Sequence, residues 1–226
     1  FNKKGSVLKN IIEKIGKTPL PPYIAQGKQR IAKQYQTVYA KHSGSAAAPT
    51  AGFHFTKNLL NKIKRLGCQT EFVTLHVGLG TFNPVNTERV EDYKIHSEWA
   101  SVDGATMKRL ITAKKEGKRI IAVGTTSTRV LETIFNGTLT RSLSRDKRDS
   151  MGVKSNEHAG LISTFIYPGY KFKFVDAMIT NFHLPKSTLL MLVSAFIGRG
   201  NALKLYKLAI QRKYRFFSYG DAMLLT

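Results

Sequence analysis

Residues 119–132 read RIIAVGTTSTRVLE, and this stretch decides the fold class that we predict. Arg119–Val123 is a short apolar run of the kind that forms a buried strand, and the glycine and hydroxyl residues after it form a turn. A helical pattern follows over Thr128–Phe135. Strand, turn and helix recur along the chain, which predicts an α/β protein with a mostly parallel sheet covered by helices.

The same patterns divide the chain into segments. We assign residues 21–226 to the α/β domain. Gly137–Ser163 is different, because it is polar, basic and without hydrophobic periodicity, and we expect it to be a disordered insertion. Outside it, helices are expected at 6–15, 56–65, 103–116, 187–196 and 201–213, and strands at 71–77, 165–167, 172–180 and 222–225.

The charge is the strongest signal in the composition. Lys and Arg number 36 against 14 acidic residues, which gives a net charge of +22. Such a chain attracts polyanions, above all nucleic acid, although a lysine-biased genome would give the same excess. The single cysteine, Cys68, excludes an internal disulfide and a multi-cysteine zinc site and favours the cytoplasm. No apolar run reaches the ~18 residues that span a bilayer.

The turn at residues 124–127 is a candidate anion site. The first amide groups of a helix lack internal partners, and the helix dipole attracts negative charge there. The hydroxyls of Thr125, Thr126 and Ser127 add donors, and Arg129 follows one turn later, where it can close over a carboxylate or phosphate. A simple helix cap is the alternative, since a cap needs only one of these hydroxyls.

Four histidines lie in turns rich in glycine, proline, serine or asparagine: His54, His76, His96 and His183. His76 precedes Gly78 and Gly80, whose small size lets backbone approach a ligand at a strand end. His96 stands two residues before Glu98, which suggests a general base and the carboxylate that orients it. A surface turn explains any single histidine equally well. A zinc site competes with this interpretation, but the spacing of zinc-binding motifs is absent.

Aromatic and basic residues alternate over Lys213–Asp221. Aromatic rings of this kind stack on nucleic-acid bases while the cations hold phosphate. An aromatic core strand with flanking charges fits the same pattern.

Three stretches are specific enough to suggest a family: Ala48–Gly52 (APTAG), Thr180–Pro185 (TNFHLP) and Arg215–Met223 (RFFSYGDAM). With them the chain resembles the S-adenosylmethionine:tRNA ribosyltransferase-isomerases of queuosine biosynthesis. Further matching stretches run in the family's order over most of the chain: Pro19–Ile24, Tyr35–Tyr39, Phe72–Phe82, His96–Glu98, Ile121–Glu132 and Phe165–Tyr170.

The resemblance implies a reaction. The ribosyl part of S-adenosylmethionine is transferred to 7-aminomethyl-7-deazaguanine in the anticodon loop of a tRNA and isomerised, giving epoxyqueuosine-tRNA. S-adenosylmethionine is then a consumed substrate, and no cofactor or metal is expected. The family fold is an α/β domain with an inserted β-barrel. We therefore expect residues 1–20 to be a remnant of that barrel and the amino-terminal part to be missing. The fragment alone is then expected to be inactive, a monomer or complemented by the missing segment.

Site residues follow from the resemblance and the turn histidines together. His76 or His96 is the expected base, with Glu98 orienting the latter, and His183 or Asp221 is the expected acid for the leaving adenine. A non-catalytic RNA-binding remnant and a metal-dependent hydrolase are the alternatives. The expected substrate-binding residues are His54, Gly78, Gly80, Thr125, Thr126, Ser127, Arg129 and Asn181.

Overall fold

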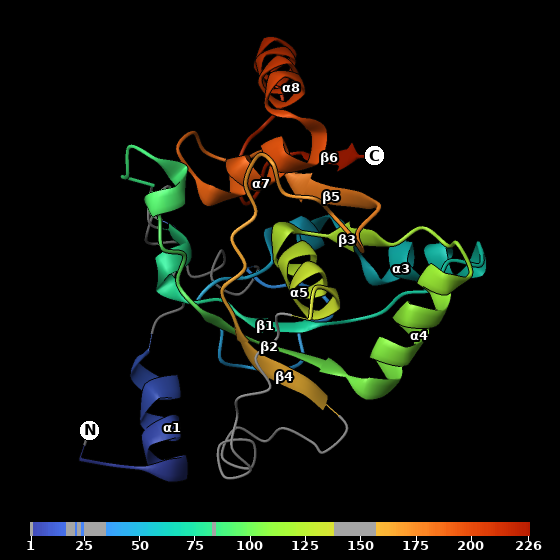
Figure 1. Ribbon diagram of the computed structural model, residues 1–226. Helices are drawn as coiled ribbons and strands as arrows, with labels where there is room; N and C mark the ends of the chain where they lie inside the picture. Colours follow the sequence, from blue (N-terminus) through green and yellow to red (C-terminus); the bar gives the residue numbers. More distant parts are fainter. Residues whose placement is uncertain (1, 17–20, 22–23, 25–34, 83–84, 138–156) are drawn as a thin grey trace. The chain divides into compact units, whose positions relative to one another are not determined.

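A computed structural model of the 226-residue chain describes all residues except 1, 17–20, 22–23, 25–34, 83–84 and 138–156 (Figure 1). The chain divides into two compact units, Phe1–Tyr35 and Gln36–Thr226, each of which is treated by itself. The first unit contains helix α1 (Gly5–Ile15), whose end is closed by a hydrogen bond from the Gly16 amide to the Ile12 carbonyl. The assignment of residues 1–20 to a barrel remnant stays a prediction.

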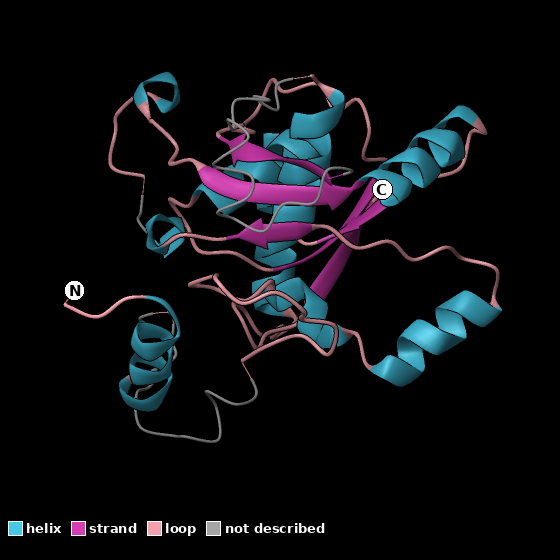
Figure 2. Cartoon of the chain, turned by 90° about the horizontal axis from the view of Figure 1, so that it is seen from below, coloured by secondary structure: helices cyan, strands magenta, loops and turns pink. Residues whose placement is uncertain are grey.

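The second unit contains two three-stranded sheets (Figure 2). In the first, β2 (Glu98–Asp103) lies between β1 (Thr74–His76) and β4 (Glu157–Ile162), and both pairings are antiparallel. The second sheet has the order β3-β5-β6. Here β3 (Ile121–Val123) pairs in parallel with β5 (Ala177–Asn181), whereas β6 (Ala222–Leu225) pairs with β5 antiparallel.

The predicted α/β class is confirmed in that the chain combines helices with strands, but the predicted mostly parallel sheet is not. Among the described strands, only β3 and β5 pair in parallel. The alternation of strands and helices is misleading because helix α4 (Gly104–Lys115) connects β2 to β3, which belong to different sheets. A parallel pair within one sheet needs such a crossover, whereas strands in separate sheets can be joined in the same way without pairing.

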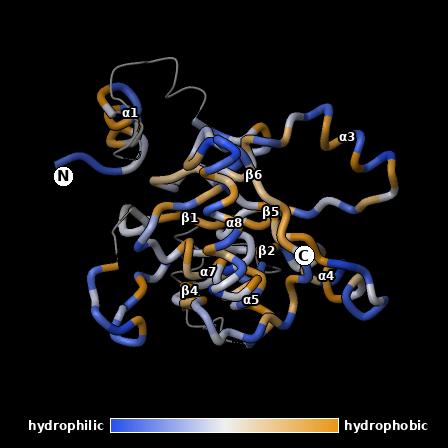
Figure 3. Tube along the Cα trace, turned by 90° about the horizontal axis from the view of Figure 1, so that it is seen from above, coloured by the Kyte–Doolittle hydropathy of each residue, from blue (hydrophilic) through white to orange (hydrophobic). Residues whose placement is uncertain are grey.

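The helices begin where side chains can cap them. The Thr56 hydroxyl accepts a hydrogen bond from the Leu59 amide at the start of α3 (Lys57–Arg65), and Asp103 accepts two at the start of α4. Ser187 caps α7 (Thr188–Ile197) in the same manner. Helix α8 (Arg199–Gln211) follows α7 after Gly198, and the described residues also form three 3₁₀ turns: η1 (Thr50–His54), η2 (Leu79–Phe82) and η3 (Val90–Asp92). Along α3 hydrophilic and hydrophobic residues alternate, and none is buried (Figure 3).

Helix α5 (Thr125–Phe135) packs against strands of both sheets (Figure 1). Val130 is fully buried in one core with Ala100, Val102 and Ile162 of the antiparallel sheet. The next residue, Leu131, packs in a second core with Ile120, Ala122 and Phe174. Because consecutive residues of a helix point about 100° apart, α5 joins the two sheets through neighbouring side chains.

The expected disordered insertion is wrong for part of its length. Residues 157–162 form β4, which pairs with β2 along its whole length and buries Ala159 and Ile162. This strand was missed because its two buried side chains are separated by a glycine and an exposed leucine, so no period of two is visible. Residues 138–156 of the predicted insertion lie outside the described part of the chain.

A third core fills the carboxy-terminal part of the second unit. Met178 and Phe182 pack there with residues of α7 and α8 and with Met223 and Leu225 of β6. None of the described helices is by itself long and apolar enough to cross a membrane. Helices α7 and α8 would pass that test together, by length and composition only, and they meet at a bend of 113°.

Candidate functional site

A buried carboxylate lies at the centre of the candidate site. The Glu98 side chain is 1% exposed. Its Oε1 atom accepts a hydrogen bond from the Gly78 amide at 3.2 Å and lies 3.1 Å from His96 Nε2, while Oε2 accepts one from Arg129 Nη1 at 2.5 Å. Since β1 and β2 are antiparallel, the residues just after β1 lie beside the start of β2, which brings Gly78 to this carboxylate.

Arg129 does not lie over the amino end of α5, where it would close over an anion, as the sequence suggested. Its side chain is 9% exposed, and its guanidinium donates to Glu98 and, through Nε, to the Thr164 carbonyl at 3.2 Å. The reason is that α5 crosses the antiparallel sheet, so position 129 faces β2. The Nη2 atom, which carries two N–H donors, is buried and has no hydrogen-bond partner among the described residues.

His96 has the geometry of an oriented base. Its side chain is 31% exposed, so solvent or a substrate can reach the ring. Glu98 holds the Nε2 side, and Gly80 lies against the other nitrogen, because a Cβ atom at Gly80 would be 2.8 Å from Nδ1. A carboxylate that fixes one imidazole nitrogen sets the tautomer and stabilises the imidazolium formed when the other nitrogen accepts a proton.

His76 belongs to a different environment. Its ring packs against Trp99 with 4.9 Å between the ring centroids, and Gly44 lies close to its Nδ1 atom. Burial, together with nearby His42, lowers the pKa of His76. No described contact joins this ring to Glu98, so the two candidate bases are not brought together.

The carboxyl edge of the parallel pair carries the second group of predicted residues. Gly124 has a φ of 91° and precedes helix α5, which begins at Thr125 and not at Thr128 as expected. Thr125, Thr126 and Ser127 therefore form the first helical turn, whose amide groups have no acceptor within the helix. The open side of Gly124 faces Ala51 of η1, so the APTAG stretch lies beside this turn.

Asn181 ends β5 at the same edge. It is 1% exposed, and its Nδ2 atom lies 3.1 Å from His54 Nε2 while its Oδ1 accepts a hydrogen bond from the Thr50 hydroxyl at 3.4 Å. Asp221 also lies at this edge, since the next residue pairs with Asn181 across β5 and β6. Two sequence stretches far apart in the chain, 48–54 and 180–185, thus meet at one place.

The two expected acids are not in the protonation states that the role requires. The Arg215 guanidinium and amide, with a smaller contribution from His54, hold the pKa of the Asp221 carboxyl below its usual range. Burial lowers the pKa of His183 to about 4, and its Nε2 atom lies 2.9 Å from the Thr180 hydroxyl. Near neutral pH the first is an anion and the second is neutral, so neither carries a proton to give readily.

The loop between β1 and β2 links the two groups of residues. Gly80 lies against His96, and a few residues later the Val85 amide donates to the Lys186 carbonyl, just beyond His183. Sequence reasoning missed Thr164 and Thr50. Thr164 gave no signal because it acts through its backbone carbonyl, whereas Thr50 lies inside the specific APTAG stretch. Among the described residues, no group of three His, Cys, Asp or Glu side chains could hold a metal ion.

Fold and site define a mixed α/β protein with a histidine–carboxylate–arginine cluster of the type that enzymes use for proton transfer. The chain belongs to the queuosine biosynthesis protein family, whose model matches residues 1–225.

Named relatives of the chain support the assignment to this family. The chain is 52% identical over 219 residues to the S-adenosylmethionine:tRNA ribosyltransferase-isomerase of Thermoanaerobacter sp. (strain X514). The aligned residues make up 97% of this chain and 60% of the relative. The chain is 54% identical over 215 residues to the enzyme of that name from Halothermothrix orenii, covering 95% and 59%. The chain thus spans about 60% of the length of these relatives. The crystal structure of the Thermotoga maritima S-adenosylmethionine tRNA ribosyltransferase superposes with a TM-score of 0.59 at 41% identity, over 78% of this chain and 51% of that one.

Proposed function

We propose that this chain carries the reaction centre of an S-adenosylmethionine:tRNA ribosyltransferase-isomerase. The observation that carries the proposal is the His96–Glu98–Arg129 cluster, found in a chain that its family model matches over residues 1–225. The relatives that bear the enzyme's name support the substrates, S-adenosylmethionine and tRNA. The net charge of +22 supports a polyanionic partner.

In this proposal His96 is the general base. The sulfonium of S-adenosylmethionine acidifies the neighbouring ribose methylene, and a neutral imidazole removes one of its protons. Glu98 orients the ring and stabilises the imidazolium, and Arg129 is the buried cation that pairs with Glu98. The electron pair left on that carbon opens the ribose ring and expels adenine, which takes up a proton, leaving an aldehyde and a vinyl sulfonium. The aminomethyl nitrogen of 7-aminomethyl-7-deazaguanine in the tRNA adds to the vinyl carbon and loses a proton, the sulfonium-bearing carbon closes onto the aldehyde, and the resulting alkoxide displaces methionine. The product is epoxyqueuosine-tRNA.

The amino end of α5 is proposed to hold the carboxylate of the methionine part. The first-turn amides of Thr125, Thr126 and Ser127 supply donors, and the helix dipole favours an anion. His54 and Asn181 lie at the same sheet edge and are proposed to contact the substrate there, with Gly78 and Gly80 on the His96 side. His183 is placed as a neutral positioning group, because its low pKa does not suit an acid.

Four further assignments belong to the same proposal. They are a cytoplasmic location, the anticodon loop as the contacted part of the tRNA, action as a monomer, and a barrel remnant in residues 1–20. Each of the four is implied by the resemblance to the family and depends on the proposed reaction. S-adenosylmethionine is proposed as a substrate and not as a recycled cofactor.

Adenine release tests the reaction directly. The purified chain, alone and fused to the remaining part of a full-length relative, is incubated with S-adenosylmethionine and a tRNA that carries the aminomethyl-deazaguanine. Free adenine is measured by chromatography, and the variants are compared in the form that releases it. His96→Gln is expected to lower the rate by at least about 100-fold, the contribution typical of a general base. His158→Gln, at an exposed position of β4, is the matched control and is expected to retain the rate. Equal rates for both variants would remove His96 from the mechanism. RNA binding without any adenine release would favour the RNA-binding alternative.

A further inference from the structure

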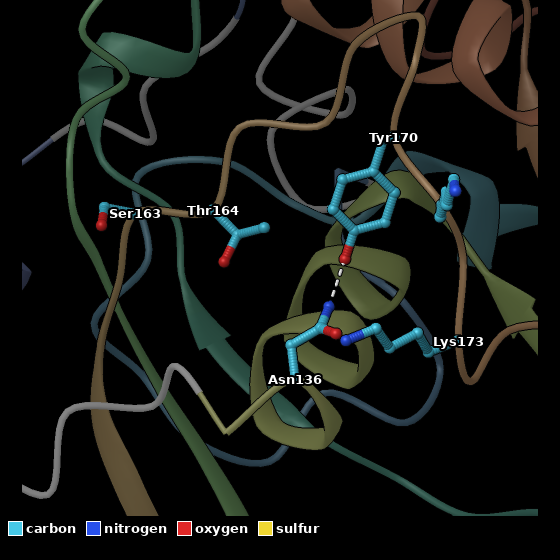
Figure 4. Close-up of a pocket in the computed structure, with 6 residues that line it drawn as sticks. Asn136, Ser163, Thr164, Tyr170 and Lys173 are labelled. Atoms are coloured by element: carbon cyan, nitrogen blue, oxygen red, sulfur yellow. Dashed lines mark hydrogen bonds between the residues drawn. The ribbon is translucent and has the colours of Figure 1, made fainter.

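A cavity lies at the carboxyl end of α5, apart from the cluster around Glu98. Its volume is about 560 Å³. Every described lining residue is polar, and among them two carry a positive charge and none a carboxylate (Figure 4): Asn136, Ser163, Thr164, Tyr170, Lys171 and Lys173. A polar cavity with positive charge and hydroxyl and amide donors suits an oxyanion.

The wall that carries the lysines is held in place by Glu132. This carboxylate is 0% exposed and accepts hydrogen bonds from the Tyr170 hydroxyl and from the backbone amides of three residues, 173, 174 and 175. Its negative charge is therefore directed into the protein and satisfied by backbone donors. Neither Lys171 nor Lys173 forms an ion pair within the described residues, so both ammonium groups remain available to a ligand at a pre-ordered wall.

The other described residues of the lining carry no full negative charge. Burial, with a further contribution from Glu132, raises the pKa of Tyr170, so its phenol stays neutral. Asn136 donates a hydrogen bond to this phenol at 2.5 Å, as Figure 4 shows. The carboxyl end of α5 contributes about half of a negative charge, which two ammonium groups outweigh.

We propose that this cavity is a subsite for one backbone phosphate of the RNA substrate. The proposal rests on the proposed function, because it takes the polyanion to be that substrate. Asn136 follows Arg129 by seven positions, about 10 Å along a helix. Thr164 joins the two places, since its carbonyl accepts from Arg129 while the residue lines the cavity. An RNA strand whose reacting base lies near His96 can thus reach the cavity within a few nucleotides.

Ser163 offers a test that leaves the wall intact. It is exposed and lies on the cavity, so Ser163→Asp adds a negative charge while Ser163→Asn adds the same bulk without charge. The probe is a fluorescein-labelled anticodon stem-loop RNA, and binding is measured by fluorescence anisotropy across a salt series. We expect the aspartate variant to bind about tenfold more weakly than the asparagine variant, as for the loss of one charge-assisted contact. Equal affinity of the two variants would overturn the subsite.

A second pair of variants tests the lysines. Lys171→Gln with Lys173→Gln is compared with Lys204→Gln and Lys207→Gln on exposed positions of α8, so that the net charge is matched. The cavity variant is expected to lose about tenfold in affinity and to lower the slope of log K against log salt by about 1. The α8 variant is expected to stay within about twofold of the parent. Identical slopes for both double variants contradict the proposal.

Two further measurements distinguish free phosphate from RNA as the ligand of the cavity, and failure of the subsite from failure of the proposed reaction. If thermal melting shows that inorganic phosphate stabilises the parent but not the cavity variant, while RNA affinity is unchanged, the cavity takes free phosphate and the RNA proposal is overturned. Adenine release by the parent chain is scored separately. Its absence would count against the proposed reaction, whereas a loss of RNA affinity confined to the cavity variants would still support the subsite.

Discussion

Replacing Glu98 by glutamine is expected to destabilise the second unit strongly. The substitution leaves the guanidinium of Arg129, whose side chain is 9% exposed, without its counter-charge. An amide cannot restore the network, because its NH₂ group would face either Arg129 or the Gly78 amide, both of which are donors. Breaking one side of a buried ion pair costs about 3–5 kcal/mol. For a unit of this size the melting temperature should fall by roughly 10 °C.

The measurement is urea unfolding followed by fluorescence. The chain has a single tryptophan, Trp99, which is adjacent to Glu98 in β2 and packs on His76, so its emission reports on this sheet. The matched control is the double variant Glu98→Gln with Arg129→Met, which removes the buried cation as well. Replacing both partners of a buried pair is often close to neutral, so the double variant should recover at least half of the lost free energy of unfolding.

The reasoning fails under two results. A Glu98→Gln variant as stable as the parent would mean that the guanidinium is not desolvated as the structure shows. A double variant no more stable than Glu98→Gln would mean that the loss arises from the neighbouring backbone and not from an unpaired charge. Turnover gives an independent reading, since the double variant is expected to regain stability without regaining adenine release.

Three further predictions concern single positions. Gly80→Ala places a Cβ atom 2.8 Å from His96 Nδ1 and should reduce adenine release at least about tenfold by displacing the ring. The control is Gly200→Ala in α8, where the added Cβ atom meets open space. This variant should instead raise the free energy of unfolding by about 0.5–1 kcal/mol. His183 is held neutral with a pKa of about 4, so the unfolded chain binds a proton first as the pH falls. The protonation of His183 therefore does not lower the free energy of unfolding above pH ~6.5, but lowers it by up to about 3 kcal/mol as the pH falls towards ~4. His183→Asn should flatten the free energy of unfolding over this pH range when it is measured by denaturation at a series of pH values. Glu132→Gln turns an NH₂ group toward backbone donors and should lower the free energy of unfolding by about 2–4 kcal/mol, measured in urea; an unchanged midpoint would contradict the hydrogen bonds assigned to it.

The local parts of the fold could be predicted from the sequence because their causes are local. Thr56 and Asp103 cap helices that begin at the next residue, and a helix does follow β3, although it begins at Thr125, three residues earlier than predicted. The last strand, 222–225, matches its predicted bounds. Each of these depends on side chains and amides within a few residues of one another, where a pattern is sufficient.

The arrangement of the strands and the role of Arg129 could not be predicted in the same way. Strand β4 owes its existence to pairing with β2, more than fifty residues earlier in the chain, and its own side chains give no periodic signal. Arg129 was expected to face a ligand because it stands one turn beyond the hydroxyls. Which face of α5 meets the antiparallel sheet is decided by packing in three dimensions, and that packing directs the guanidinium to Glu98.

Helix α5 explains how residues from two sheets come to serve one proposed reaction. Its amino end lies at the carboxyl edge of the parallel pair, and one turn later Arg129 is bound to the first residue of β2. Val130 and Leu131 fix the helix in two different cores, so it cannot shift against one sheet without disturbing the other. The turn proposed to bind the carboxylate and the His96–Glu98 pair therefore keep a constant separation. A substrate that bridges a carboxylate site and a base requires a fixed distance of this kind.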